Sequence, residues 1–87
     1  MSELNVHVTD RRWLTVAGNT IDIHYMDAVG PVLHLEERYR FNLHLRGSVV
    51  TVGYSTRDYL ESEVEKVRRQ VVEAWRDAIG RPRQVAL

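Results

Sequence analysis

Apolar and polar residues alternate from Leu4 to Tyr54, whereas from Asp58 to Ile79 apolar residues recur every three or four positions. A period of two is typical of a strand with one buried face, and the longer period is typical of an amphipathic helix. The chain therefore predicts an α+β fold in which one C-terminal amphipathic helix packs on the strands. We expect a curved antiparallel sheet of five or six strands, arranged as a meander.

The strand predicted between residues 38 and 46 has the strictest alternation. Its apolar side consists of Tyr39, Phe41, Leu43 and Leu45. Its polar side, called the arginine row below, consists of Arg38, Arg40, Asn42, His44 and Arg46. Neighbouring residues in a strand point to opposite sides, so we expect a buried set and an outer row. Gly47-Ser48 predicts a two-residue turn that pairs Leu43 with Val52.

A second hairpin is predicted around Gly18-Asn19, with Val16 opposite Ile21. This register places Trp13 on the outer side of the sheet, across from His24. If the register is one residue different, Trp13 lies under the helix instead. A short strand is expected from 32 to 35, and Glu36-Glu37 is read as a bend, a bulge or part of one long strand.

The predicted helix has signals at both ends. Ser55 and Asp58 have the spacing of a capping box, and Gly80 followed by Pro82 predicts the stop. Its apolar stripe is formed by Leu60, Val64, Val67, Val71, Trp75 and Ala78. We expect one domain over residues 1–80 and a flexible tail over 81–87.

Composition narrows the function classes. The 87 residues include no cysteine, which excludes disulfide frameworks, thiolate zinc sites and cysteine nucleophiles. Twelve basic residues balance twelve acidic ones, so attraction to nucleic acid would require a local patch. The chain lacks a long apolar run and a signal-type start, and we therefore expect a cytoplasmic protein that does not enter a membrane.

Each of the four histidines lies between apolar neighbours. They are His7, His24, His34 and His44. In half-buried strands this flanking places each imidazole on the wet side of the sheet. His24 and His34 would face each other if their strands were antiparallel about Val29, so a small histidine-based metal protein is one alternative. No catalytic motif is recognisable, and we expect neither enzymatic activity nor a cofactor.

The arginine row is the strongest functional signal. Guanidinium groups bind carboxylates and phosphates, and arginine is enriched at interface hot spots. The row, together with an outward Trp13, predicts a surface that binds a protein partner. Two other interpretations remain open: the row binds a nucleic-acid backbone, or it pairs with acidic residues of the next strand and only keeps the sheet soluble. Unpaired sheet edges also make a homodimer a candidate.

The stretch Val8-Thr9-Asp10-Arg11-Arg12, the hairpin from Trp13 to Tyr25 and the turn Asp27-Ala28-Val29 resemble the start of bacterial pleckstrin-homology-like domains. This resemblance implies a partial barrel capped by a C-terminal helix and a binding role without catalysis. The basic first loop of lipid-binding members is not matched, because this loop reads Ala17-Gly18-Asn19-Thr20. The leading hypothesis is a non-enzymatic interaction module, with small inhibitor or immunity-type proteins as one subclass.

Overall fold

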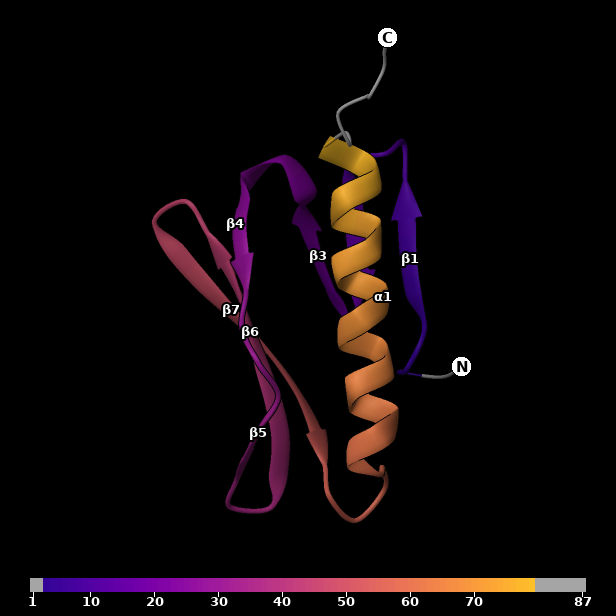
Figure 1. The fold of residues 1–87 in the computed structure, drawn as a ribbon, viewed down its shortest axis with the longest axis vertical. Helices are drawn as coiled ribbons and strands as arrows, with labels where there is room; N and C mark the ends of the chain where they lie inside the picture. Colours follow the sequence, from indigo (N-terminus) through magenta and orange to yellow (C-terminus); the bar gives the residue numbers. More distant parts are fainter. Residues whose placement is uncertain (1–2, 80–87) are drawn as a thin grey trace, which may run out of the picture.

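The computed structural model describes residues 3–79, in which seven strands and a short 3-10 helix precede one long helix (Figure 1). The elements are β1 (Val6–Thr9), β2 (Trp13–Val16), β3 (Asn19–Asp22), η1 (Ile23–Tyr25), β4 (Met26–Val29), β5 (Leu33–Leu35), β6 (Arg38–Leu45), β7 (Ser48–Ser55) and α1 (Glu61–Ile79). The α+β class, the antiparallel pairing and the C-terminal helix are confirmed. The strands number seven, in two sheets, instead of five or six in one. The predicted tail, 81–87, lies outside the described residues.

The strands form two antiparallel sheets. Sheet A has the order β1-β2-β3, and in sheet B the long strand β6 pairs with β7 on one side and with both β4 and β5 on the other. Pro31, which lacks a backbone N–H, interrupts the β4–β5 edge. Arg68 of the helix donates from Nε to the Gly30 carbonyl at 2.6 Å and from Nη2 to the Val29 carbonyl at 3.2 Å. The helix thus satisfies carbonyls that the interruption leaves without strand partners.

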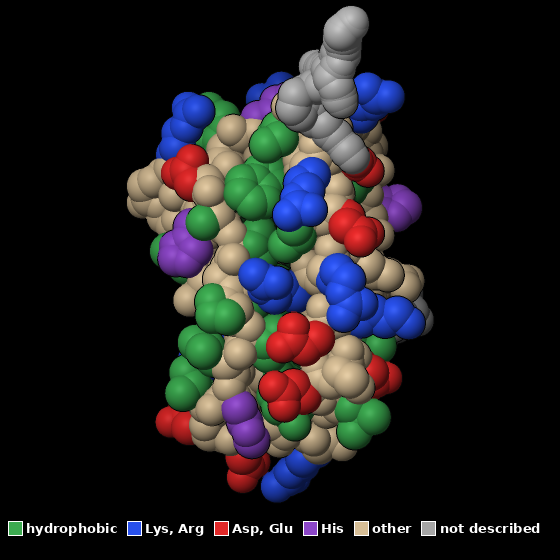
Figure 2. Space-filling model, in the orientation of Figure 1, with side chains coloured by type: hydrophobic (Ala, Val, Ile, Leu, Met, Phe, Trp, Pro, Cys, Tyr) green, Lys and Arg blue, Asp and Glu red, His purple; other side chains and the backbone are tan. Residues whose placement is uncertain are grey.

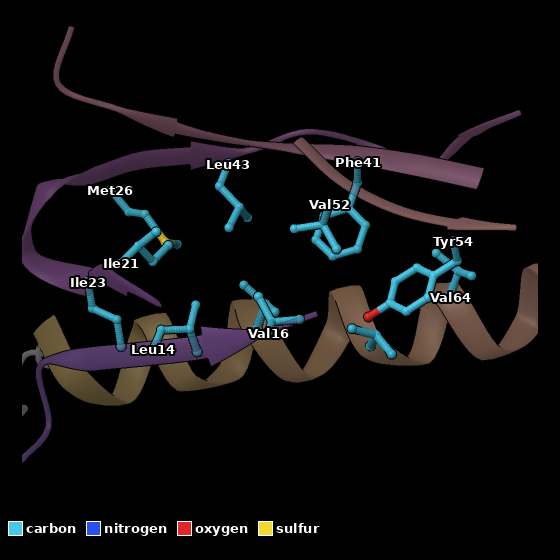
Figure 3. Close-up of a cluster of buried hydrophobic side chains, with 12 residues drawn as sticks. Leu14, Val16, Ile21, Ile23, Met26, Phe41, Leu43, Val52, Tyr54 and Val64 are labelled. Atoms are coloured by element: carbon cyan, nitrogen blue, oxygen red, sulfur yellow. The ribbon is translucent and has the colours of Figure 1, made fainter. Parts of the chain in front are cut away.

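The core lies between the two sheets and the helix (Figure 3). Its buried residues are Leu14, Val16, Ile21, Ile23, Met26, Phe41, Leu43, Val52, Tyr54, Val64, Val67 and Val71. Phe41 and Leu43 are 1% and 0% exposed, so the side of β6 predicted to be buried is confirmed. Every strand except β1 and β5 contributes to this cluster, and the inner faces of the two sheets therefore point toward each other.

Both predicted hairpin registers are wrong by two residues. The β2–β3 turn is Ala17-Gly18, with φ of 50° and 81°, and it pairs Leu14 with Ile21. The β6–β7 turn likewise has glycine in its second position, with Gly47 at φ 78°. A glycine can occupy either position of a two-residue turn. We predicted it in the first position, whereas the structure has it in the second, and this difference shifts every cross-strand partner by two residues. Because a shift of two keeps every side chain on its own face, the predicted buried sides still hold.

The turn at Ala17 offers a first test. Alanine at positive φ carries a steric cost of about 1 kcal/mol, which asparagine largely avoids because it tolerates the left-handed conformation. We expect Ala17→Asn to raise the free energy of unfolding by about 0.5–1 kcal/mol in urea denaturation. Ala28→Asn, on an exposed strand position with ordinary φ, is the matched control and should give no gain. Equal effects of the two changes would contradict the turn assignment.

The helix begins at Glu61, and the predicted capping box is wrong. Glu63 Oε1 accepts a hydrogen bond from the Leu60 backbone N–H at 2.8 Å, which satisfies a donor at the helix start. Ser55 Oγ instead accepts from the Arg57 backbone N–H at 3.1 Å and shapes the turn after β7. Leu60 therefore lies outside the helix and is exposed, whereas Val64, Val67 and Val71 of the predicted stripe are buried.

Candidate functional site: the outer face of sheet B

The arginine row lies on the outer face of sheet B. The inward side chains of Phe41 and Leu43 fix this orientation, since their neighbours along β6 must point outward. Arg40, Asn42 and His44 are partly buried in the middle of the strand. Arg38 at the start of β6 and Arg46 in the following turn are exposed. The structure thus places Arg38, Arg40, Asn42 and His44 on one surface, and Arg46 lies in the turn that follows them.

Strand β7 lies beside β6, and its outward residues contact the row. Asn42 lies opposite Thr51, and its Oδ1 accepts a hydrogen bond from the Thr51 hydroxyl at 2.8 Å. Arg38 reaches across to Gly53, where an added Cβ would lie only 2.9 Å from the guanidinium Nη2. The missing side chain at Gly53 therefore leaves room for the guanidinium to lie flat over β7. This packing limits the freedom of Arg38 and lowers the entropy that it loses on binding.

The arginines of the row have no acidic partner within the described part of the chain. Among residues 3–79 the ion pairs join Arg12 to Asp22 at 3.0 Å and Arg57 to Glu37 at 3.9 Å. β7 carries no acidic residue, so no carboxylate of that strand can pair with the row. By contrast, acidic and basic side chains are interspersed on the side of the molecule that carries α1 (Figure 2).

Arg40 and Arg46 differ in what surrounds their guanidinium groups. Arg40 Nε is enclosed and has no hydrogen-bond acceptor among the described residues. The guanidinium carbon of Arg46 lies 5.3 Å from the ring centre of Tyr25, within the range of a cation–π contact. An enclosed N–H without an acceptor has lost water without a replacement, which is a cost to the stability of the folded chain.

Exposed leucines accompany the row. Leu33 and Leu35 of β5 lie opposite Arg40 and Arg38, which places them on the same outer face, 44% and 45% exposed. His34 faces the other way, and its ring centre lies 4.9 Å from that of Tyr39. The prediction that every histidine lies opposite the core side is therefore wrong for His34. All three residues of β5 are exposed, so the alternation of apolar and polar residues in this strand does not mark a buried face.

Trp13 lies on a different surface from the arginine row. It is 41% exposed, which confirms its outward position, but it belongs to sheet A and lies opposite Asp22 instead of His24. Because the inner faces of both sheets enclose the same core, their outer faces point away from each other. The predicted binding set is thus divided, with Trp13 on the far side from the row.

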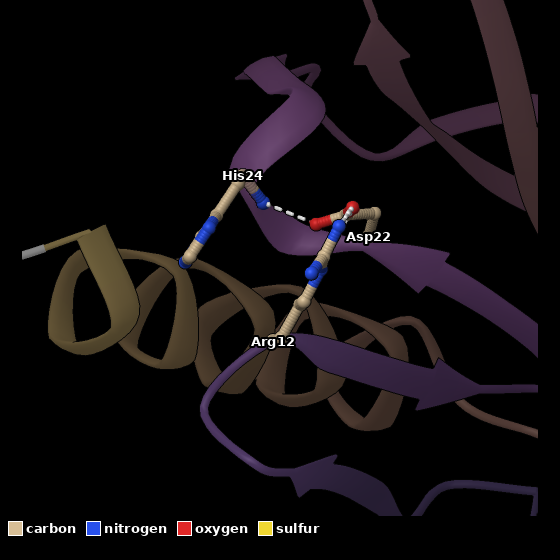
Figure 4. A network of polar contacts seen from close by, with 3 residues as sticks. All are labelled: Arg12, Asp22 and His24. Carbon is tan, nitrogen blue, oxygen red and sulfur yellow. Dashed lines mark hydrogen bonds and ion pairs between the residues drawn. The ribbon is translucent and has the colours of Figure 1, made fainter.

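Arg12 was not predicted, and it organises the surroundings of Trp13 (Figure 4 shows its polar contacts). Its guanidinium carbon lies 5.0 Å from the Trp13 ring centre, and Nη2 lies 3.0 Å from an Asp22 carboxylate oxygen. Burial acts to raise the pKa of Asp22, but hydrogen bonds from Arg12 and from the His24 backbone N–H, with the Arg12 charge, outweigh burial and lower it. The adjacency of Arg12 and Trp13 was the signal available in the sequence.

The four histidines are dispersed. His7 lies on the outer face of sheet A, His24 in η1, and His44 on the outer face of sheet B. The expected pairing of His24 with His34 is wrong, because β4 and β5 both pair with β6 and not with each other. Within residues 3–79 no group of three His, Cys, Asp or Glu side chains could hold a metal ion.

Comparison with known proteins returns no match to a family model, a curated protein or a solved structure. In the described part of the chain, α1 is not apolar enough over its length to cross a membrane. A functional proposal for this chain must therefore come from the geometry of its surfaces.

Proposed function

We propose that this protein is a non-enzymatic interaction module that binds an acidic surface of a protein partner through the outer face of sheet B. The observation that carries the proposal is three arginines in one row, none of them ion-paired within residues 3–79, beside exposed leucines. Charge-assisted hydrogen bonds from guanidinium to carboxylate are among the stronger polar contacts in interfaces. The open sheet face suits a module that covers a charged site of its partner, as small inhibitor and immunity-type proteins do.

The apolar residues of this face favour protein over nucleic acid. Leu33, Leu35 and Val49 are each more than two fifths exposed, and a phosphate backbone would leave them uncovered. Single-strand binders also combine basic residues with stacking aromatic rings, whereas Tyr39 and Phe41 of β6 point to the inner side. A partner surface with carboxylates flanked by apolar side chains would satisfy both the arginines and the leucines.

A pleckstrin-homology-like fold remains a proposal. It is supported by seven strands in two antiparallel sheets that are followed by one C-terminal helix. The turn between β2 and β3 carries no basic residue, whereas the loop of the first hairpin, between β1 and β2, carries Arg11 and Arg12. The fold itself would not identify the partner, because one scaffold serves many functions.

Charge reversal tests the site. We expect Arg38→Glu with Arg40→Glu to lower partner recovery from host lysate at least about tenfold, because carboxylates would then face carboxylates. Affinity purification of tagged protein followed by mass spectrometry and nucleic-acid staining is the measurement. Arg69→Glu with Arg76→Glu is the matched control, since it makes the same change in net charge at exposed helix positions.

Three outcomes are informative. Loss of one protein partner in the sheet variant alone, with unchanged thermal melting, supports the proposal. Equal recovery by both variants shows that the partner does not use the arginine row. Recovery of nucleic acid that depends on the row and falls steeply with salt would retain the surface and overturn the partner class.

A further inference from the structure

The outer edge of β7 is open and unusually long for this molecule. β7 has eight residues and keeps a continuous register from Arg38–Ser55 to Leu45–Ser48. Among residues 3–79 its only strand partner is β6. β7 contains no charged residue, no proline and no bulge. Ser48, Val49 and Thr51 are exposed, and Val49 is 53% exposed. An exposed strand of this composition offers its free backbone groups to another strand.

The other sheet edges have features that disfavour pairing with a strand of another molecule. β1 and β3 have only four residues each, and β3 ends with Asp22. The β4–β5 edge is interrupted at Pro31, and its carbonyls at Val29 and Gly30 are bonded to Arg68. Short strands, charges and prolines are the usual protection of edges. β7 lacks all of them, so it stands out as the edge suited to pairing.

The pattern along β7 is complementary to itself. Leu45 and Ser48 close a two-residue hairpin and form a hydrogen-bonded pair, and such pairs alternate along an antiparallel ladder. The backbone groups of Val49, Thr51 and Gly53 therefore face the open edge. An antiparallel copy centred on Thr51 would make about six hydrogen bonds with these groups. It would also place the exposed Val49 opposite Gly53 of the second copy, beside the Arg38 guanidinium that lies over that glycine.

We propose that the protein forms a two-fold symmetric dimer in which β7 pairs with β7 of a second copy about Thr51. The occupant is a second copy because the uncharged strand meets no like charge in itself, and because valine and glycine are equally spaced on either side of the symmetry centre. The two B sheets then form one continuous sheet, and its outer face carries two arginine rows. This inference rests on the edge strand and stands whether or not the row binds a protein.

Site-directed cross-linking tests the register, since the chain has no cysteine of its own. In the proposed dimer the two Thr51 Cα atoms lie about 5.5 Å apart, within the range of a disulfide. The two Ser48 Cα atoms lie about 20 Å apart. In a glutathione buffer we expect full-length Thr51→Cys to form covalent dimer at least about tenfold faster than Ser48→Cys, which is the matched exposed control on the same strand.

Sedimentation of the unmodified chain tests the association itself. We expect twice the 10.1 kDa chain mass at high concentration. Val49→Lys should weaken the dimer at least about tenfold, because it would bring an ammonium group beside Arg38 of the second copy. Leu33→Lys adds the same charge on the same face away from β7 and should leave the dimer intact. A 10.1 kDa species at several hundred micromolar, or equal cross-linking at the two cysteine positions, would overturn the proposal.

Discussion

Phe41→Ala will lower the free energy of unfolding by about 3–5 kcal/mol. Phe41 is 1% exposed in the middle of β6 and lies opposite Val52 within the core that joins both sheets and the helix. Truncation removes a buried ring and leaves a cavity that the neighbouring strands fill only in part. An 87-residue domain is stable by about 4–13 kcal/mol. The variant should therefore be close to unfolding, as measured by urea denaturation followed by circular dichroism.

Leu35→Ala is the control for this prediction. Leu35 lies in the same sheet but is 45% exposed on the outer face, so its truncation should cost less than about 1 kcal/mol. The contrast separates core packing from a general effect of removing apolar atoms from sheet B. Equal losses in Phe41→Ala and Leu35→Ala would mean that β6 does not present its Phe41 side to the core.

The inward and outward sides of β6 could be predicted because burial of one face forces alternation, and Phe41 and Leu43 carry that signal. The hairpin registers could not be predicted from Gly18 and Gly47 alone. Either loop position accepts a glycine with positive φ, and the choice depends on the strands that continue from the turn. The sequence also shows that the strand after Gly47 has no carboxylate to offer the arginines, because no acidic residue occurs between Gly47 and Asp58.

The division of the predicted site has a different cause. Trp13 and Arg40 both alternate with buried residues, and a sequence pattern shows only that each lies opposite the core. Whether their outer faces coincide depends on the assignment of strands to sheets, which is set by contacts between distant residues. The orientation of β5 is similar, because Leu33 and Leu35 look buried by pattern and yet pair with Arg40 and Arg38 on the outer face. Pairing with β6, and not burial, determines the side on which they lie.

Alkaline pH will destabilise the fold through Tyr54. This phenol is 1% exposed and donates a hydrogen bond to the Glu3 carbonyl at 2.7 Å. Burial, with the negative charges of Glu3 and of ionised Tyr59 nearby, raises the pKa of Tyr54 to about 12, whereas the unfolded chain has the ordinary value of about 10. The folded state holds the proton more tightly, so the contribution to stability is complete below pH 10. It is lost as pH rises from 10 through 12, by about 3 kcal/mol in total.

Tyr54→Phe separates this effect from other alkaline titrations. Below pH 10 the variant should be about 1 kcal/mol less stable than the unmodified chain, because the bond to Glu3 is lost. Between pH 10 and 12 its stability should fall less than that of the unmodified chain, since the Tyr54 phenol no longer has to ionise, and the two stability curves should therefore cross. Tyr25→Phe, at a half-exposed position, should follow the unmodified chain throughout. Parallel loss of stability in the unmodified chain and Tyr54→Phe would show that the fold does not bury the Tyr54 phenol, and the end of β7 would then not be held against the N-terminal segment.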